Sequence, residues 1–114
     1  MPKDQFVERP TKRSEYRIIC ATRQAQKGWQ DLRATTLSAL ADAWDALTRD
    51  PLRDDPTCHP LKGDLGSVTH AGVAHVRRQY QMPGGARIWY YVTDGRPGTV
   101  HLLDVHTHHP NATK

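Results

Sequence analysis

The residues with the clearest chemical potential are the histidines and arginines in the second half of this 114-residue chain. Residues 58–114 contain all seven histidines and six Lys or Arg against three Asp, whereas residues 35–57 contain five Asp against two Arg. An imidazole, with a reference pKa of about 6.5, can take or give a proton near neutral pH. A guanidinium can bind a phosphate through two parallel hydrogen bonds. The basic half of the chain therefore suits a phosphate-bearing ligand.

The histidines near the end of the chain, His106, His108 and His109, allow three interpretations. Two histidines at positions i and i+2 can ligate zinc from one strand face. However, no second Cys/His group lies at a familiar zinc spacing, so we expect no metal and no other cofactor. Alternatively, one of these histidines, at a strand end, acts as a general acid or base near neutral pH. The third interpretation is that these histidines only cover a sheet edge.

Four basic residues are candidates for binding phosphate: Arg87, Arg77, Arg78 and Lys62. Arg87 follows a Gly-Gly turn, where a guanidinium can meet a ligand. Arg77 and Arg78 are adjacent in a strand-like segment, so they point to opposite faces and at most one can join Arg87. Lys62 lies between Leu61 and a glycine. Each of the four can equally be a solvated surface side chain.

Three segments with strand-like composition, residues 73–82, 87–93 and 99–106, are joined by glycine- and proline-containing turns and predict an antiparallel meander. In the middle segment, alternation puts Ile88, Tyr90 and Val92 on one face and Arg87, Trp89 and Tyr91 on the other. We expect the first face to lie in the core and the second to be open. On an open face, Trp89 and Tyr91 can stack on bases or pack against a partner protein.

Before the meander, the sequence predicts a strand at residues 16–20 and helices at 23–32 and 36–48, with Thr22 as an N-cap and Pro51 as a stop. The fold class is therefore α+β: a helical hairpin packed on one face of a mainly antiparallel four-stranded sheet, in the order β-α-α-β-β-β. The residues expected to pack the helices on the sheet are Trp29, Leu37, Leu40, Trp44 and Leu47. Loss of the Trp44 side chain should then cost about 3–5 kcal/mol.

The composition fits one domain at residues 16–114 preceded by a flexible arm at residues 1–15, which hold seven charged positions. There is no apolar run near the roughly 18 residues that a membrane helix needs, and no signal peptide, so a cytoplasmic protein is expected. In that setting Cys20 and Cys58 are reduced thiols. The net charge of +4 and a pI near 9.3 favour a polyanion or an acidic protein as partner.

Four segments resemble the RelE/ParE toxin superfamily: residues 59–63 (HPLKG), 77–80 (RRQY), 85–92 (GARIWYYV) and 101–110 (HLLDVHTHHP). The resemblance runs from about residue 16 to residue 110 and includes the order of elements. It implies a toxin of a type II toxin–antitoxin system. Most RelE-like members cleave mRNA on the ribosome without a metal, so the implied partners are a cognate antitoxin, mRNA and the ribosome.

The resemblance also implies roles for individual residues. The arginine that contacts the scissile phosphate falls on Arg87, and assisting basic residues fall on Arg77 or Arg78. An acid or base before the Pro-Leu-Lys segment falls on His59, and proton transfer beyond the last strand falls on His108 or His109. The sequence departs from the family where a tyrosine is common, because residues 110 and 111 are Pro and Asn.

Two alternatives remain open at this point. Gyrase-inhibiting ParE-like members share the superfamily but lack the nuclease residues, and a non-enzymatic nucleic-acid-binding or regulatory module can present the same basic surface. A nuclease of this kind needs histidine and arginine to converge within hydrogen-bonding reach, whereas the other two do not.

Overall fold

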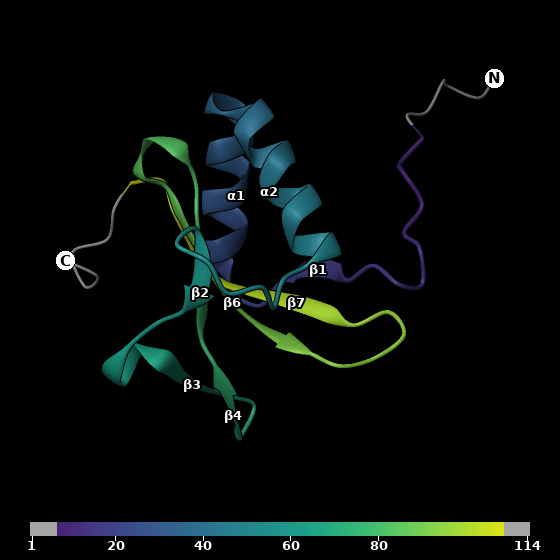
Figure 1. The fold of residues 1–114 in the computed structure, drawn as a ribbon. Helices are drawn as coiled ribbons and strands as arrows, with labels where there is room; N and C mark the ends of the chain where they lie inside the picture. Colours follow the sequence, from purple (N-terminus) through teal and green to yellow (C-terminus); the bar gives the residue numbers. More distant parts are fainter. Residues whose placement is uncertain (1–6, 109–114) are drawn as a thin grey trace.

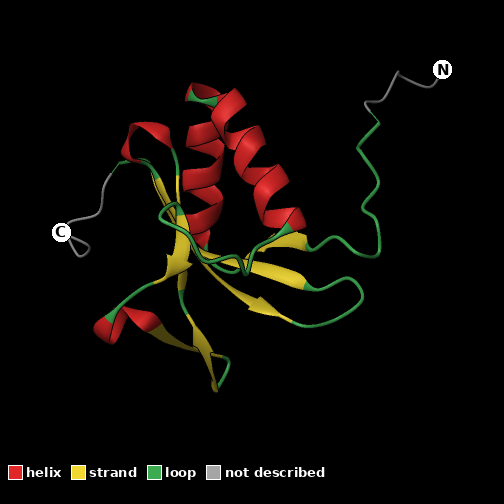
Figure 2. Cartoon of the chain, viewed as in Figure 1, coloured by secondary structure: helices red, strands yellow, loops and turns green. Residues whose placement is uncertain are grey.

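Residues 7–108, the part of the chain that the computed structural model describes, form two α-helices and seven strands (Figures 1 and 2). In chain order these are β1 (Arg17–Cys20), α1 (Arg23–Thr35), α2 (Leu37–Arg49), β2 (Cys58–Pro60), β3 (Ser67–His70), β4 (Val73–Val76), β5 (Arg78–Gln81), β6 (Arg87–Thr93) and β7 (Thr99–His106). The 3₁₀ turns η1 (Gly63–Gly66) and η2 (Pro83–Gly85) precede β3 and β6.

The main sheet has five strands in the order β1-β7-β6-β5-β2, not the four expected from the sequence. Its centre is the predicted antiparallel meander β5-β6-β7, which is confirmed. β1 lies at one edge and runs parallel to β7, and β2, which was not predicted, lies at the other edge, antiparallel to β5. The α+β class and the helical hairpin on one face are also confirmed (Figure 1).

The predicted strand at residues 73–82 is wrong in one respect, because it is two strands separated at Arg77. β4 pairs with β3 in a separate two-stranded sheet, while β5 pairs with β6. The backbone of Arg77 bonds to Gly66 and Leu61 instead of continuing either ladder. The β3–β4 hairpin turns at Ala71 and Gly72, which both have positive φ (53° and 80°), as a type I′ turn requires.

The helix boundaries follow from capping and from proline. The Thr22 hydroxyl accepts a hydrogen bond from the backbone N–H of Ala25 at 3.0 Å, which confirms the predicted N-cap of α1. α1 continues to Thr35, three residues beyond the predicted end. Thr36 does not cap α2 with its side chain, because its hydroxyl donates back to the carbonyl of Leu32. α2 ends at Arg49, just before Pro51.

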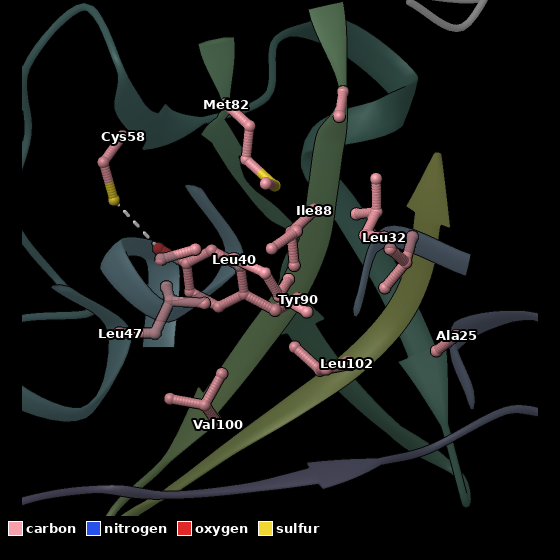
Figure 3. Packing of buried hydrophobic residues seen from close by; sticks show 13 residues of the cluster. Ala25, Leu32, Leu40, Leu47, Cys58, Met82, Ile88, Tyr90, Val100 and Leu102 are labelled. Carbon is pink, nitrogen blue, oxygen red and sulfur yellow. Dashed lines mark hydrogen bonds between the residues drawn. The ribbon is translucent and has the colours of Figure 1, made fainter. Parts of the chain in front are cut away.

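The core lies between the helices and the sheet and is centred on Tyr90 (Figure 3). The Tyr90 hydroxyl donates to the carbonyl of Pro51 at 2.7 Å and lies 3.0 Å from Sγ of Cys58. Burial raises the pKa of Tyr90 well above its ordinary value, so the hydroxyl stays neutral and available as a donor. The buried hydrophobic residues around it are Ala25, Leu32, Leu40, Ala43, Leu47, Met82, Ala86, Ile88, Val100, Leu102 and Val105.

The expected role of Trp44 in this core is wrong. Leu37 and Trp44 are 60% and 38% exposed, while Leu40 and Leu47 are buried. Trp44 instead packs edge-on against Trp29, with ring centroids 6.2 Å apart, at the mouth of a groove between the helices. Helical periodicity identified the apolar stripe, but the stripe is wider than the sheet can cover.

We therefore expect Leu47→Ala to destabilise the fold by about 2–5 kcal/mol, the usual range for a fully buried leucine. Trp44→Ala should cost less, because much of its surface is already in contact with water. Urea denaturation of the two variants measures the difference. A larger loss for Trp44→Ala than for Leu47→Ala would contradict the position of Trp44 at the surface.

α1 packs very closely against the last part of β7. The side-chain amide of Gln24 donates to the carbonyl of Val105 at 2.9 Å and accepts from its N–H at 2.8 Å. A Cβ atom added at Gly28 would lie 2.1 Å from the carbonyl oxygen of Val105. Since β1 pairs with β7 only as far as Leu102, these contacts take over where the β1 ladder stops.

At the N-terminal end, Arg9 forms an ion pair with Glu15 at 2.9 Å, and Glu15 also accepts from the N–H of Lys12. The N–H of Tyr16 donates to the carbonyl of Thr48 at the end of α2. Within residues 7–108, no helix has the length and apolar character needed to cross a membrane.

Candidate active site

The sheet face opposite the helices, called here the distal face, carries the side chains that the sequence assigned to a ligand. Its members on the two central strands include Arg87, Trp89, Tyr91, His101 and His106. In a regular strand, His101 and His106 would point to opposite faces because they are five residues apart. The ladder between β6 and β7 shifts register after Trp89, so that one extra residue of β7 lies between these histidines. This β-bulge brings both histidines to the distal face.

Arg87 and His106 lie directly opposite each other across β6 and β7. Neighbours in such a pair have Cβ atoms about 4.5–5.5 Å apart, within reach of one phosphate group. Arg87 is buried, and its Nη1 donates to the carbonyl of Ala86 at 3.3 Å. Among the described residues, Nε of Arg87 and Nε2 of His106 are buried without a hydrogen-bond partner. Such atoms are uncommon in folded proteins, and both are covered from solvent, so a ligand reaches them only when neighbouring side chains move aside.

Burial lowers the pKa of His106 below its ordinary value, and His108 acts in the same direction while Asp104 acts against both. The imidazole of His106 is therefore neutral at pH 7 and can accept a proton. The edge of its ring contacts Trp89, with centroids 4.6 Å apart at 74°. This contact orients the imidazole beside Arg87.

Trp89 is 6% exposed, so the expectation that it lies on an open surface is wrong. Its indole N–H donates to Oε1 of Gln79 at 2.9 Å. The guanidinium of Arg77 lies over the ring at 5.5 Å from its centroid, and Nη1 of Arg77 donates to the carbonyl of Leu65. Nε of Arg77 is a further buried nitrogen without a partner in residues 7–108. The Arg77 side chain thus covers Trp89 on the distal face and places a positive charge beside the indole ring.

Tyr91 is also covered, with 3% of its surface exposed. The covering element is the β3–β4 hairpin, which lies below the main sheet in Figure 1, on the side away from the helices. His75 stacks on one side of the Tyr91 ring with centroids 4.0 Å apart, and His101 stacks on it at 4.4 Å. In this arrangement neither Trp89 nor Tyr91 is accessible to a base.

Arg78 does not belong to the site, because it points to the helical side of the sheet. Its Nε donates to the carbonyl of Pro51 at 3.0 Å, and its Nη2 donates to the carbonyl of Arg53. The predicted opposition of Arg77 and Arg78 is confirmed, and Arg77 is the one on the distal face. Arg78 instead fastens the loop after α2 to β5, which does not fit the RNA-binding role expected for it.

His59 and Lys62 form a second group of predicted residues, at the far edge of the sheet. His59 is on β2 opposite Gln79, and its Nδ1 lies 2.9 Å from the carbonyl of Pro60. Together with Asp54 and Asp55, His59 and Lys62 line a shallow pocket. This pocket is separated from β6 by β5, so the structure does not bring His59 together with Arg87.

Of the two histidines expected beyond the last strand, His108 is exposed and follows β7 by two residues, and His109 lies outside the described residues. Proton transfer was assigned to these two residues, whereas His106 was considered as one of the clustered histidines but not as the partner of Arg87, and Gln79 was not considered. Regular pairing of β6 with β7 from Thr93 opposite Thr99 would put Val105 opposite Arg87, so only the bulge makes His106 its neighbour, and no local sequence pattern signals that bulge. Gln79 carried no sequence signal either.

In residues 7–108, no three His, Cys, Asp or Glu side chains are grouped so that they could hold a metal ion. Comparison of the chain with models of known protein families, with curated proteins and with solved structures gives no significant match. The chemistry of the site therefore has to be argued from the residues themselves.

Proposed function

We propose that this protein is a metal-independent endoribonuclease that cleaves mRNA, the toxin of a type II toxin–antitoxin system. The observation that carries the proposal is the Arg87–His106 pair, in which a guanidinium and a neutral imidazole meet on adjacent strands with unpaired nitrogens. These are the two groups that phosphodiester transfer through a ribose 2′-hydroxyl requires. The resemblance of four sequence segments to RelE-like toxins supports the same assignment.

In the proposed reaction, the ribose 2′-oxygen attacks the adjacent phosphorus and the bond to the 5′-oxygen of the next nucleotide breaks. His106 takes the proton of the 2′-hydroxyl, since its imidazole is neutral at pH 7. Arg87 stabilises the extra negative charge on the pentacoordinate phosphorane, and Arg77 supplies a second cation. His108 or His109 gives a proton to the leaving 5′-oxygen. The products are a 2′,3′-cyclic phosphate and a 5′-hydroxyl end.

The cognate antitoxin is proposed to bind the groove between α1 and α2. This groove has a volume of about 230 Å³ and is lined by Trp29, Arg33, Leu37, Leu40, Ala41 and Trp44. An amphipathic helix uses such grooves for its apolar face, and an acidic residue at its margin would meet Arg33. The net charge of +4 also favours an acidic partner, and it favours mRNA and the ribosome as polyanions.

The proposal is tested by incubating the purified protein with mRNA in a translation mixture, with and without a chelator, and mapping the new ends. We expect 2′,3′-cyclic phosphate ends in both conditions and no cleavage where a 2′-deoxynucleotide replaces the nucleotide that supplies the 2′-hydroxyl. A folded protein that leaves mRNA intact would refute the proposal. Inhibition of gyrase supercoiling by that same preparation would point to the ParE-like activity instead.

The pH dependence of cleavage tests which histidine is the base. Because burial lowers the pKa of His106, kcat/KM should fall towards acid with a midpoint below the ordinary value of 6.5. The value of kcat/KM falls towards acid pH because the base works only when it is deprotonated, and the lowered pKa of His106 keeps it deprotonated at neutral pH. His106→Ala should remove this acidic limb. If the limb persists in His106→Ala and disappears in His59→Ala, the base is His59.

A further inference from the structure

Three histidines from three different strands surround the buried ring of Tyr91. His75 of β4 and His101 of β7 are stacked on the ring, at 20° and 4° to its plane, and His70 of β3 is tilted against it with centroids 5.8 Å apart. A 2.8 Å hydrogen bond between its Nε2 and Oγ1 of Thr93 holds the His101 imidazole in place. The β3–β4 hairpin therefore meets the main sheet through a stack of titratable rings.

The charged groups that act on His101 in this stack are all positive. Burial lowers the pKa of His101, and the neighbouring groups that lower it further are His75, His70 and Arg17 of β1. Burial also raises the pKa of the Tyr91 hydroxyl, so that the ring between the histidines stays uncharged. At neutral pH the His101 imidazole is therefore neutral. As the pH falls, the closed arrangement therefore opposes protonation of His101.

The first proton is tolerated, because one imidazolium on the face of a tyrosine gains a cation–π interaction. A second cation on the same ring is repelled by the first, because charges that are partly buried are screened less than exposed ones. Arg17 adds a fixed positive charge that no pH change in this range removes. Moving the hairpin away separates His70 and His75 from His101 and Arg17, and lets the histidines become hydrated.

The rest of the hairpin does little to resist such a movement. β3 and β4 pair only with each other, and Val73 and Val76 of β4 point into solvent. The backbone anchor of the hairpin lies at its base, where Arg77 bonds to Gly66 and Leu61. A segment with few buried apolar contacts opens at a lower free-energy cost than the core strands do.

We propose that the β3–β4 hairpin is a cover over the distal face, held closed by the stacking of His70 and His75 on Tyr91 and released when the histidine cluster is protonated. The closed hairpin keeps RNA bases away from Tyr91, and release exposes this ring for stacking. The second half of this statement rests on the proposed function, whereas the opening itself does not.

Hydrogen exchange followed by NMR between pH 7.5 and 5.5 tests the opening on the wild-type protein without RNA. Protection factors, which correct for the pH dependence of exchange itself, should fall in residues 67–76 about tenfold for each unit by which closure lowers the pKa of His101. The amides of α1 and β7 should keep their protection. Unchanged protection of residues 67–76 down to pH 5.5 would overturn the proposal.

The double variant His70→Phe/His75→Phe separates charge from stacking, because phenylalanine keeps an aromatic ring on Tyr91 and cannot be protonated. Its hairpin should stay protected at pH 5.5. His59→Phe is the matched control, since His59 lies on β2 outside the stack, and it should open like the wild type. A double variant that loses protection as the wild type does would show that these histidines are not the switch.

A separate RNA-binding experiment with an uncleavable 2′-O-methyl RNA tests the role of the cover. The wild type should bind this RNA more tightly at pH 5.5 than the double variant does, and Tyr91→Ala should abolish the difference. If the hairpin opens but RNA binding does not distinguish the two proteins, the cover exists and the ribonuclease proposal loses support.

Discussion

Arg87→Met is expected to slow RNA cleavage about 10²–10³-fold, the usual loss when one preorganised electrostatic donor is removed from a reaction centre. Arg87 lies opposite His106 and has a buried Nε that no described residue uses. The charge on the phosphorane grows where this guanidinium is already fixed, so no reorganisation is needed during the reaction. The effect should appear mainly in kcat, because a group that binds charge present only in the transition state contributes little to KM.

Methionine is preferred to alanine here because Arg87 is buried and its stem fills space on the distal face. An open position for Arg87, as the sequence predicted, would have made alanine harmless to the fold. Arg87→Lys keeps the charge but loses the planar fork, and should recover only part of the rate. Arg96→Met, in the exposed β6–β7 loop, is the matched control and should cleave like the wild type. Full activity in a folded Arg87→Met protein would remove Arg87 from the mechanism.

Gly28→Ala is expected to destabilise the fold by about 3 kcal/mol or more, the upper end of overpacking costs. The added Cβ would lie 2.1 Å from the carbonyl oxygen of Val105, and a backbone atom cannot move aside as a flexible side chain does. Alanine in a helix is normally favoured over glycine by about 1 kcal/mol, so a loss of stability in Gly28→Ala is diagnostic of the close contact with Val105. A helix without this contact would be stabilised.

The measurement for Gly28→Ala is a denaturant titration of the variant beside Gln30→Ala, an exposed position of α1. Gln30→Ala should be neutral or slightly stabilising, because it adds helix propensity without a clash. If both variants gained stability, the close packing of α1 on β7 would be wrong. Loss of stability in Gly28→Ala alone supports it.

The parts of the fold that were predictable are those set by local chemistry. Thr22 and Pro51 delimit the helical hairpin, and the glycine-containing turns delimit the meander, because capping and turn formation depend on neighbouring residues. The alternation in β6 also assigned Ile88 and Tyr90 correctly to the core. Alternation, however, says only that two faces differ. It does not say whether a second element covers the other one.

Three features of the structure were not predicted, because none of them follows from local sequence patterns. The hairpin at residues 67–76 has a turn, Ala71-Gly72, whose first residue is not one of the usual turn formers, so β3 was not predicted and β4 was merged with β5 into one strand at residues 73–82. Its histidines then cover Tyr91, a tertiary contact that no local pattern carries. The bulge in β7 moves His106 to the face of Arg87, and a one-residue shift of this kind reverses every assignment beyond it.

The amide of Gln24 bonds both backbone groups of Val105, and in doing so it occupies the place of a neighbouring strand. That half of β7 therefore offers no free backbone edge to another polypeptide. The edges at which the main sheet ends are β1 and β2, of four and three residues. Edges as short as these are poor templates for the edge-to-edge growth that leads to aggregation. Gln24 at Val105 and the Thr22 hydroxyl at the carbonyl of Leu103 thus cover the edge of the longest strand within residues 7–108.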